Sequence, residues 1–130
     1  MIMFEIHEIP KPQKQTHFAR GHCYDPSKNY KDMLVWQMRP YAPNEPLSGP
    51  LHVDITFLMP IPKTSSASVR RQMIANNLHA IKRPDIDNLA YIITNAMKNL
   101  IYKDDSQIVD LHLHKRYAEC PRTVVKVTEV

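Results

Sequence analysis

Residues 82–108, KRPDIDNLAYIITNAMKNLIYKDDSQI, combine the clearest helical pattern in the chain with four aspartates. Apolar residues recur there at three- and four-residue intervals, the spacing of one buried face of an amphipathic helix. The pattern predicts a helix from about Asp87 to Asn99, and Asn99 suits the left-handed conformation in which helices often end. The predicted buried stripe comprises Leu89, Ile92, Ile93, Ala96, Met97 and Leu100, and the polar side comprises Asn88, Tyr91 and Asn95.

Two of the aspartates, Asp85 and Asp87, stand where this helix begins. The proline at position 84 disfavours a helical conformation of Arg83, so we expect the chain to arrive extended and to become helical around Asp87. In an extended segment, residues two apart point to the same side. Both carboxylates should therefore lie together near the positive end of the helix dipole, which keeps them ionised.

A divalent cation would relieve the repulsion between two carboxylates held so close. Carboxylate oxygens are hard ligands that suit Mg²⁺ or Mn²⁺ better than zinc. The predicted helix is ~18 Å long, and the six residues from Asn99 to Asp105 span ~20 Å when extended, so Asp105 can return to the helix start. The sequence thus allows Asp85, Asp87 and Asp105 to converge on one metal ion.

Phosphodiester hydrolysis is the chemistry that such a centre supports, because a bound divalent ion polarises a phosphate and lowers the pKa of a bound water. Lys82, Arg83 and Lys103 flank the aspartates and would offset their repulsion of an anionic substrate. A purely structural explanation stays open, since aspartates commonly cap helices and the pair Asp104–Asp105 is typical of a turn.

The rest of the chain predicts strands and further helices around this segment. Residues 11–28 are basic and aromatic and are predicted to form a loop, whose Lys14 and Arg20 are candidates for phosphate contacts. Alternating apolar residues predict strands at 2–7, 51–59, 109–114 and 123–130. Helical spacing predicts helices at 26–39 and within 69–78, and three prolines predict an irregular connection at 41–50.

The bulk properties describe one ordinary globular domain. The chain has 130 residues, of which 43% are hydrophobic and 23% charged, and its net charge of +4 favours an anionic partner. Its two cysteines are too few for a disulfide framework, which agrees with a reducing compartment. Because no apolar run approaches ~20 residues and the N-terminal residues do not resemble a signal peptide, we expect a cytoplasmic protein without a membrane segment.

Two segments resemble a known family: IKRPDIDNL (81–89) and YKDDSQI (102–108) are similar to the paired signature of the RusA family of Holliday junction resolvases. These are small endonucleases often carried by prophages. The order of the remaining strands and of the basic loop is similar as well. The resemblance implies an α/β (α+β) fold spanning residues 1–130, with a mixed β-sheet and two main helices. It also implies a homodimer that binds four-way DNA junctions and makes paired, Mg²⁺-dependent nicks during DNA recombination and repair.

The resemblance assigns roles to individual residues. It implies that Asp85, Asp87 and Asp105 are catalytic and bind the metal, with Asp104 and Tyr91 as accessory groups. Two positions depart from the family pattern, because Tyr91 stands where lysine is usual and Asn95 where aspartate is typical. Residues expected to contact DNA are Lys82, Arg83, Lys103, Lys14 and Arg20.

Three alternatives follow from the same sequence. The departures suggest a junction-binding protein with reduced or lost nuclease activity, and the acidic cluster alone suggests a generic metal phosphohydrolase. A zinc site is the third, because His112 and His114 share one strand face near Cys120 and a His22–Cys23 pair lies upstream. No zinc-finger spacing accompanies these residues, so an exposed polar strand face is favoured over zinc.

Overall fold

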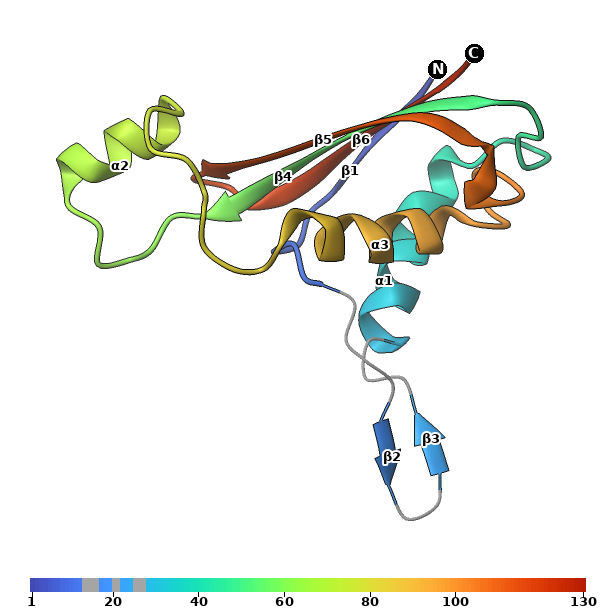
Figure 1. The fold of residues 1–130 in the computed structure, drawn as a ribbon, viewed down its shortest axis with the longest axis horizontal. Helices are drawn as coiled ribbons and strands as arrows, with labels where there is room; N and C mark the ends of the chain where they lie inside the picture. The colour runs from blue at the N-terminus through green and yellow to red at the C-terminus, as the bar shows by residue number, and fades with distance from the viewer. Residues whose placement is uncertain (13–16, 20–21, 25–27) are drawn as a thin grey trace.

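Four strands form one mixed sheet in the computed structural model, which describes residues 1–12, 17–19, 22–24 and 28–130. The strand order is β1–β6–β4–β5, with β4 and β5 parallel and the other neighbours antiparallel (Figure 1). The four predicted strands and the mixed sheet are therefore confirmed. Their bounds are β1 Ile2–Ile6, β4 Leu51–Pro60, β5 Ile108–Ala118 and β6 Arg122–Glu129.

Helix α1 (Lys28–Met38) precedes β4 in the chain, and α2 (Ala67–Ile74) and α3 (Ile86–Met97) lie in the connection between β4 and β5. Two parallel neighbours need a long crossover, and here it contains α2 and α3. Figure 1 shows α3 and α1 under the same face of the sheet, with α2 beyond one end. The two predicted main helices thus cover the sheet, and α2 is the predicted short helix, capped by the hydroxyl of Ser66. None of the helices in the described ranges has the length and apolarity needed to cross a bilayer.

The core lies between the sheet and α3. Along β4, Val53, Ile55 and Phe57 point inward and are at most 1% exposed, as the alternating pattern predicts. The stripe on α3 faces them, with Leu89 and Ile92 fully buried. Burying these side chains supplies the main driving force for folding, at ~2 kcal/mol for each large apolar side chain.

The segment predicted as a loop at 11–28 contains an antiparallel hairpin, so that prediction is wrong in part. Strands β2 (His17–Ala19) and β3 (His22–Tyr24) pair with His17 opposite Tyr24. Each strand has only three residues, too few for the alternation that identifies strands in a sequence. Lys14, Arg20 and the predicted helix start at residues 25–26 lie outside the described residues.

Candidate active site at the two ends of α3

Asp85 and Asp87 lie at the N-terminal end of α3, as the sequence predicts. Asp85 is the N-cap residue, with an extended backbone (φ −69°, ψ 146°), and its side chain accepts no hydrogen bond from the helix. Asp87 Oδ1 accepts a hydrogen bond of 3.0 Å from the backbone N–H of Asn88. Both residues are exposed, so most of their oxygen lone pairs are available to a ligand.

A cleft of about 620 Å³ opens beside Asp85. The Lys115 ammonium of β5 donates hydrogen bonds to the backbone carbonyls of Lys82 and Pro84, the latter at 2.8 Å, and so ties the segment before α3 to the sheet. Lys82 and Arg83 keep their own side chains exposed next to the cleft. The residues lining it are Pro10, Pro12, Arg83, Pro84, Asp85 and Asn88.

Asp105 lies beyond the other end of α3, in the 3-10 turn Asp105–Gln107 that precedes β5. It is exposed and lines a second cleft, of about 410 Å³. Lys103, two residues earlier, is exposed too. The other residues lining this cleft are Thr94, Ser106, Ile108 and Leu111.

The turn that carries Asp105 is braced on both sides. The Gln107 amide donates hydrogen bonds of 2.9 Å to the carbonyls of Leu47 and Gly49. The backbone N–H of Lys103 donates to the carbonyl of Leu47 at 3.1 Å, and that of Leu47 donates to the carbonyl of Ile101 at 3.0 Å. The connection before β4 therefore fixes the position of this turn.

The carboxylate of Asp104 is engaged in contacts that hold the turn. Its carboxylate accepts hydrogen bonds from the hydroxyl and the backbone N–H of Ser106, and its own N–H donates to Gln107 Oε1 at 2.8 Å. These hydrogen bonds from Ser106, followed by the Lys98 ammonium 3.0 Å away, lower the pKa of Asp104 to about 2. The same ion pair raises the pKa of Lys98. For Asp104, the structural explanation offered by the sequence accounts for the contacts.

The segment between α3 and Asp105 folds into a tight turn instead of returning extended. Asn99 has the predicted left-handed conformation (φ 65°). The N–H groups of Leu100 and Ile101 then donate to the carbonyl of Met97, and the N–H of Asn99 donates to the carbonyl of Tyr102. The chain therefore caps the C-terminal end of α3 and stays there.

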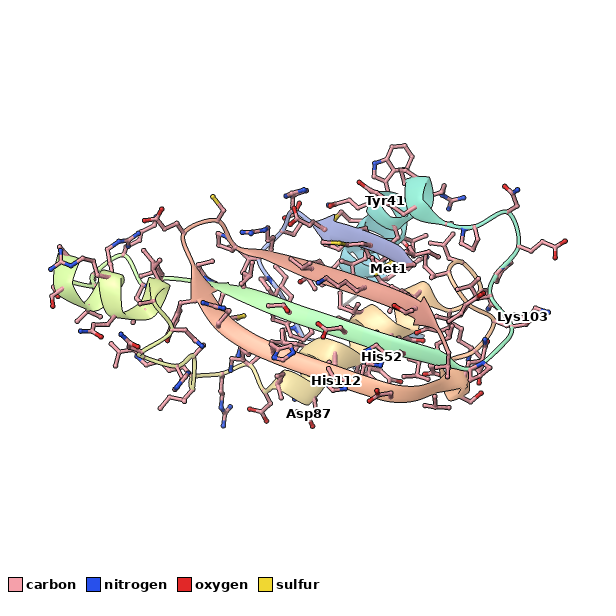
Figure 2. The ribbon with its side chains drawn as sticks, turned by 90° about the horizontal axis from the view of Figure 1, so that it is seen from above. Met1, Tyr41, His52, Asp87, Lys103 and His112 are labelled. Atoms are coloured by element: carbon pink, nitrogen blue, oxygen red, sulfur yellow. The ribbon has the colours of Figure 1, made fainter. Side chains whose placement is uncertain are left out.

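A single chain consequently keeps Asp105 away from Asp85 and Asp87. Thr94, which shares a cleft with Asp105, follows Asp85 by nine residues, which corresponds to about 13 Å along a helix axis. Within the described residues, Asp85, Asp87 and Asp105 do not form a group whose carboxylate oxygens all lie within 4.8 Å of one another. Figure 2 agrees, because the labelled Asp87 and Lys103 lie far apart along the molecule.

A different group of metal-type ligands does come together on the sheet. One ligand atom each from His52, Asp110 and His112 lies within 4.8 Å of the other two. The sequence pattern singles out His112 with His114 and Cys120 and does not reveal His52 and Asp110. Residues 58 positions apart become neighbours only through the register of β4 and β5, which no local pattern reveals.

Comparisons with known proteins agree with this architecture. A relative from Bacillus subtilis (strain 168), described as uncharacterized protein YqaN, is 33% identical over 137 residues, covering 99% of this chain and 96% of the relative. The family model described as Endodeoxyribonuclease RusA matches residues 7–128, which include both ends of α3, strands β4 and β5, and all of β6 except its last residue. The chain belongs to the RusA endodeoxyribonuclease family.

Proposed function

We propose that this protein is a Mg²⁺-dependent endonuclease that resolves four-way DNA junctions by paired nicks, in DNA recombination and repair. Membership of the RusA family implies Holliday junction resolvase activity. The observation that supports the assignment in this chain is the pair of exposed carboxylates, Asp85 and Asp87, at the start of α3 beside a cleft that Arg83 lines. Because its proposed substrate is branched DNA, we propose that the enzyme acts in the cytoplasm.

Asp85 and Asp87 fit a magnesium ion by their chemistry. They offer hard oxygen ligands at the positive end of a helix, and the Asp85 side chain is not used as a helix cap. Asp105 is the proposed third carboxylate ligand. Bound Mg²⁺, for which Mn²⁺ can substitute, supplies charge stabilisation at the phosphate and a more acidic water.

Basic side chains near each cleft are proposed to hold the DNA backbone. Lys82 and Arg83 are exposed next to Asp85, and Lys103 is exposed next to the turn of Asp105. Contacts of this kind position a duplex without reading its sequence, which suits recognition of a branched shape. Lys14 and Arg20 are proposed to extend this surface.

We further propose that a two-fold dimer supplies Asp105 in trans. If α3 packs against its mate about a two-fold axis perpendicular to the helix, the N-terminal end of each helix lies beside the C-terminal end of the other. The braced turn argues against movement of Asp105 within its own chain. Val109 and Leu111 lie near Asp105 on β5, an edge strand, and are 66% and 43% exposed, so this apolar surface suits a partner.

A nicking assay on synthetic four-way, three-way and linear DNA tests the proposal. We expect Mg²⁺-dependent nicks in the four-way junction, at symmetric positions, and their loss when a chelator removes the metal. Equal cleavage of linear DNA, or turnover of small phosphodiesters without preference for branched DNA, would instead identify a generic metal phosphohydrolase.

A junction-binding protein with reduced or lost nuclease activity is the second candidate. It is favoured by Tyr91, which is 57% exposed four residues after Asp87 and supplies no positive charge where the family usually has lysine. This candidate predicts tight binding of the four-way junction and no cleavage with either Mg²⁺ or Mn²⁺. Cleavage by the unmodified protein excludes it.

A further inference from the structure

We propose that His52, Asp110 and His112 bind a divalent first-row transition metal, such as Zn²⁺, at a site separate from the aspartates of α3. The three residues lie on the face of the sheet opposite α1 and α3, where Figure 2 shows His52 and His112 side by side over β4 and β5. This site requires no nuclease activity, so it stands or falls independently of the proposed function.

The register of β4 and β5 brings the three side chains together. A shift of register after Leu51 leaves Val109 without a partner and sets His52 opposite Asp110. Residues two apart along a strand share a face, so His112 follows Asp110 on the same side. The shift therefore positions a histidine of one strand against an aspartate and a histidine of its neighbour.

The distances between the three side chains suit a metal ion that all three would bind. His52 Nδ1 lies 2.6 Å from Asp110 Oδ2, and His112 Nε2 lies 3.0 Å from Asp110 Oδ1. The two imidazole rings are 5.0 Å apart between centroids and tilted by 41°. In a tetrahedral zinc site with bonds of ~2.0–2.1 Å, neighbouring ligand atoms are ~3.3 Å apart. The observed separations of 2.6 and 3.0 Å from Asp110 are close to that spacing.

The ligand set selects transition metals over magnesium. Two imidazoles and one carboxylate match the affinities of zinc, cobalt and nickel, whereas Mg²⁺ prefers oxygen ligands throughout. The side chains of His52, Asp110 and His112 are 37%, 52% and 51% exposed, so the ion can enter from solvent and keep a water ligand. A bound ion would join edge strand β5 to β4, its neighbour in the sheet, and so stabilise that edge.

Titration of the metal-free, full-length protein with Zn²⁺ against a chromophoric chelator tests the site. We expect one ion per chain, with affinity at least ~10-fold lower in His52→Asn and in Asp110→Asn. His114→Asn is the matched control, because His114 lies two residues after His112 on the same strand, pairs with Asp54 at 3.7 Å and is not a member of the cluster. Its affinity for Zn²⁺ should stay within about twofold of the unmodified chain.

Two further measurements separate binding from a change in fold. Circular dichroism should show that the variants fold, since all three side chains are half exposed, and Zn²⁺ should raise the unfolding temperature of the unmodified chain but not of His52→Asn. Absence of Zn²⁺ binding to the folded, unmodified protein would show that the three residues form only a hydrogen-bonded surface cluster. Equal loss of affinity in His114→Asn and His52→Asn would also overturn the assignment.

Discussion

Four aspartates in one short segment differ in what their oxygens already contact. Among the described residues, the Asp104 carboxylate is engaged by Ser106 and Lys98, whereas the Asp85 side chain makes no cap hydrogen bond and Asp87 accepts one from a neighbouring N–H. The sequence predicted where Asp85 and Asp87 lie, because Pro84 and the apolar stripe define the helix start. The sequence does not show which member of the Asp104–Asp105 pair caps the turn, because an aspartate at either position can do so.

Replacement of Asp87 by asparagine should remove nicking while sparing junction binding. The amide preserves size but loses the charge that holds the metal, and metal charge stabilisation is worth several kcal/mol, or ~10²-fold or more in rate. Asp32→Asn is the control, because Asp32 is an exposed aspartate on α1 outside either cleft. Measured on a four-way junction, equal rates for Asp87→Asn and the unmodified chain would remove Asp87 from the site.

Helix α3 was largely predictable and its C-terminal turn was not. The apolar stripe predicted the buried face of α3, and Asn99 predicted the left-handed residue that follows the helix. The extended return from Asn99 to Asp105 did not occur because residues after Met97 satisfy the free carbonyls that end every helix. The number of residues sets the greatest distance that the segment can span. It does not determine whether the segment returns along the helix or caps its C-terminal end.

Tyr102, in the turn that caps α3, should contribute to the free energy of unfolding. The buried Tyr102 hydroxyl donates a hydrogen bond of 2.6 Å to the carbonyl of Thr94 in the last turn of α3, and burial raises the pKa of this phenol. Tyr102→Phe leaves that carbonyl without its donor, so we expect the free energy of unfolding to fall by ~1–2 kcal/mol in urea denaturation. Tyr41→Phe, at a half-exposed tyrosine, is the control and should change stability little. A similar loss in both variants would exclude this explanation.

The arrangement of the whole sheet depends on pairings between distant segments. Alternation predicted each long strand, but neither the parallel pairing of β4 with β5 nor the position of β5 at the edge follows from local pattern. For the same reason the sequence missed that His52 meets Asp110 and that Val109 and Leu111 stay exposed. The first of these features forms the proposed metal site, and the second forms the proposed dimer surface.

The dimer surface can be tested with two matched leucines. Leu111 and Leu78 are both 43% exposed, but only Leu111 lies on β5 beside the cleft of Asp105. Leu111→Asp should shift the protein from dimer to monomer in light scattering and reduce nicking, whereas Leu78→Asp should leave it dimeric, since charge is costly only where the surface becomes buried. A dimer that survives Leu111→Asp would place the interface elsewhere.

A dimer that shares its aspartates makes the most direct prediction about the active site. In a heterodimer of Asp85→Asn and Asp105→Asn chains, a site built in trans combines an intact Asp85 from one chain with an intact Asp105 from the other. Nicking of a four-way junction by the heterodimer, purified through two different tags, is the decisive measurement. The account predicts that both variant homodimers are inactive and that the heterodimer recovers single nicks. A heterodimer as inactive as the two homodimers, or an active Asp105→Asn homodimer, would contradict it.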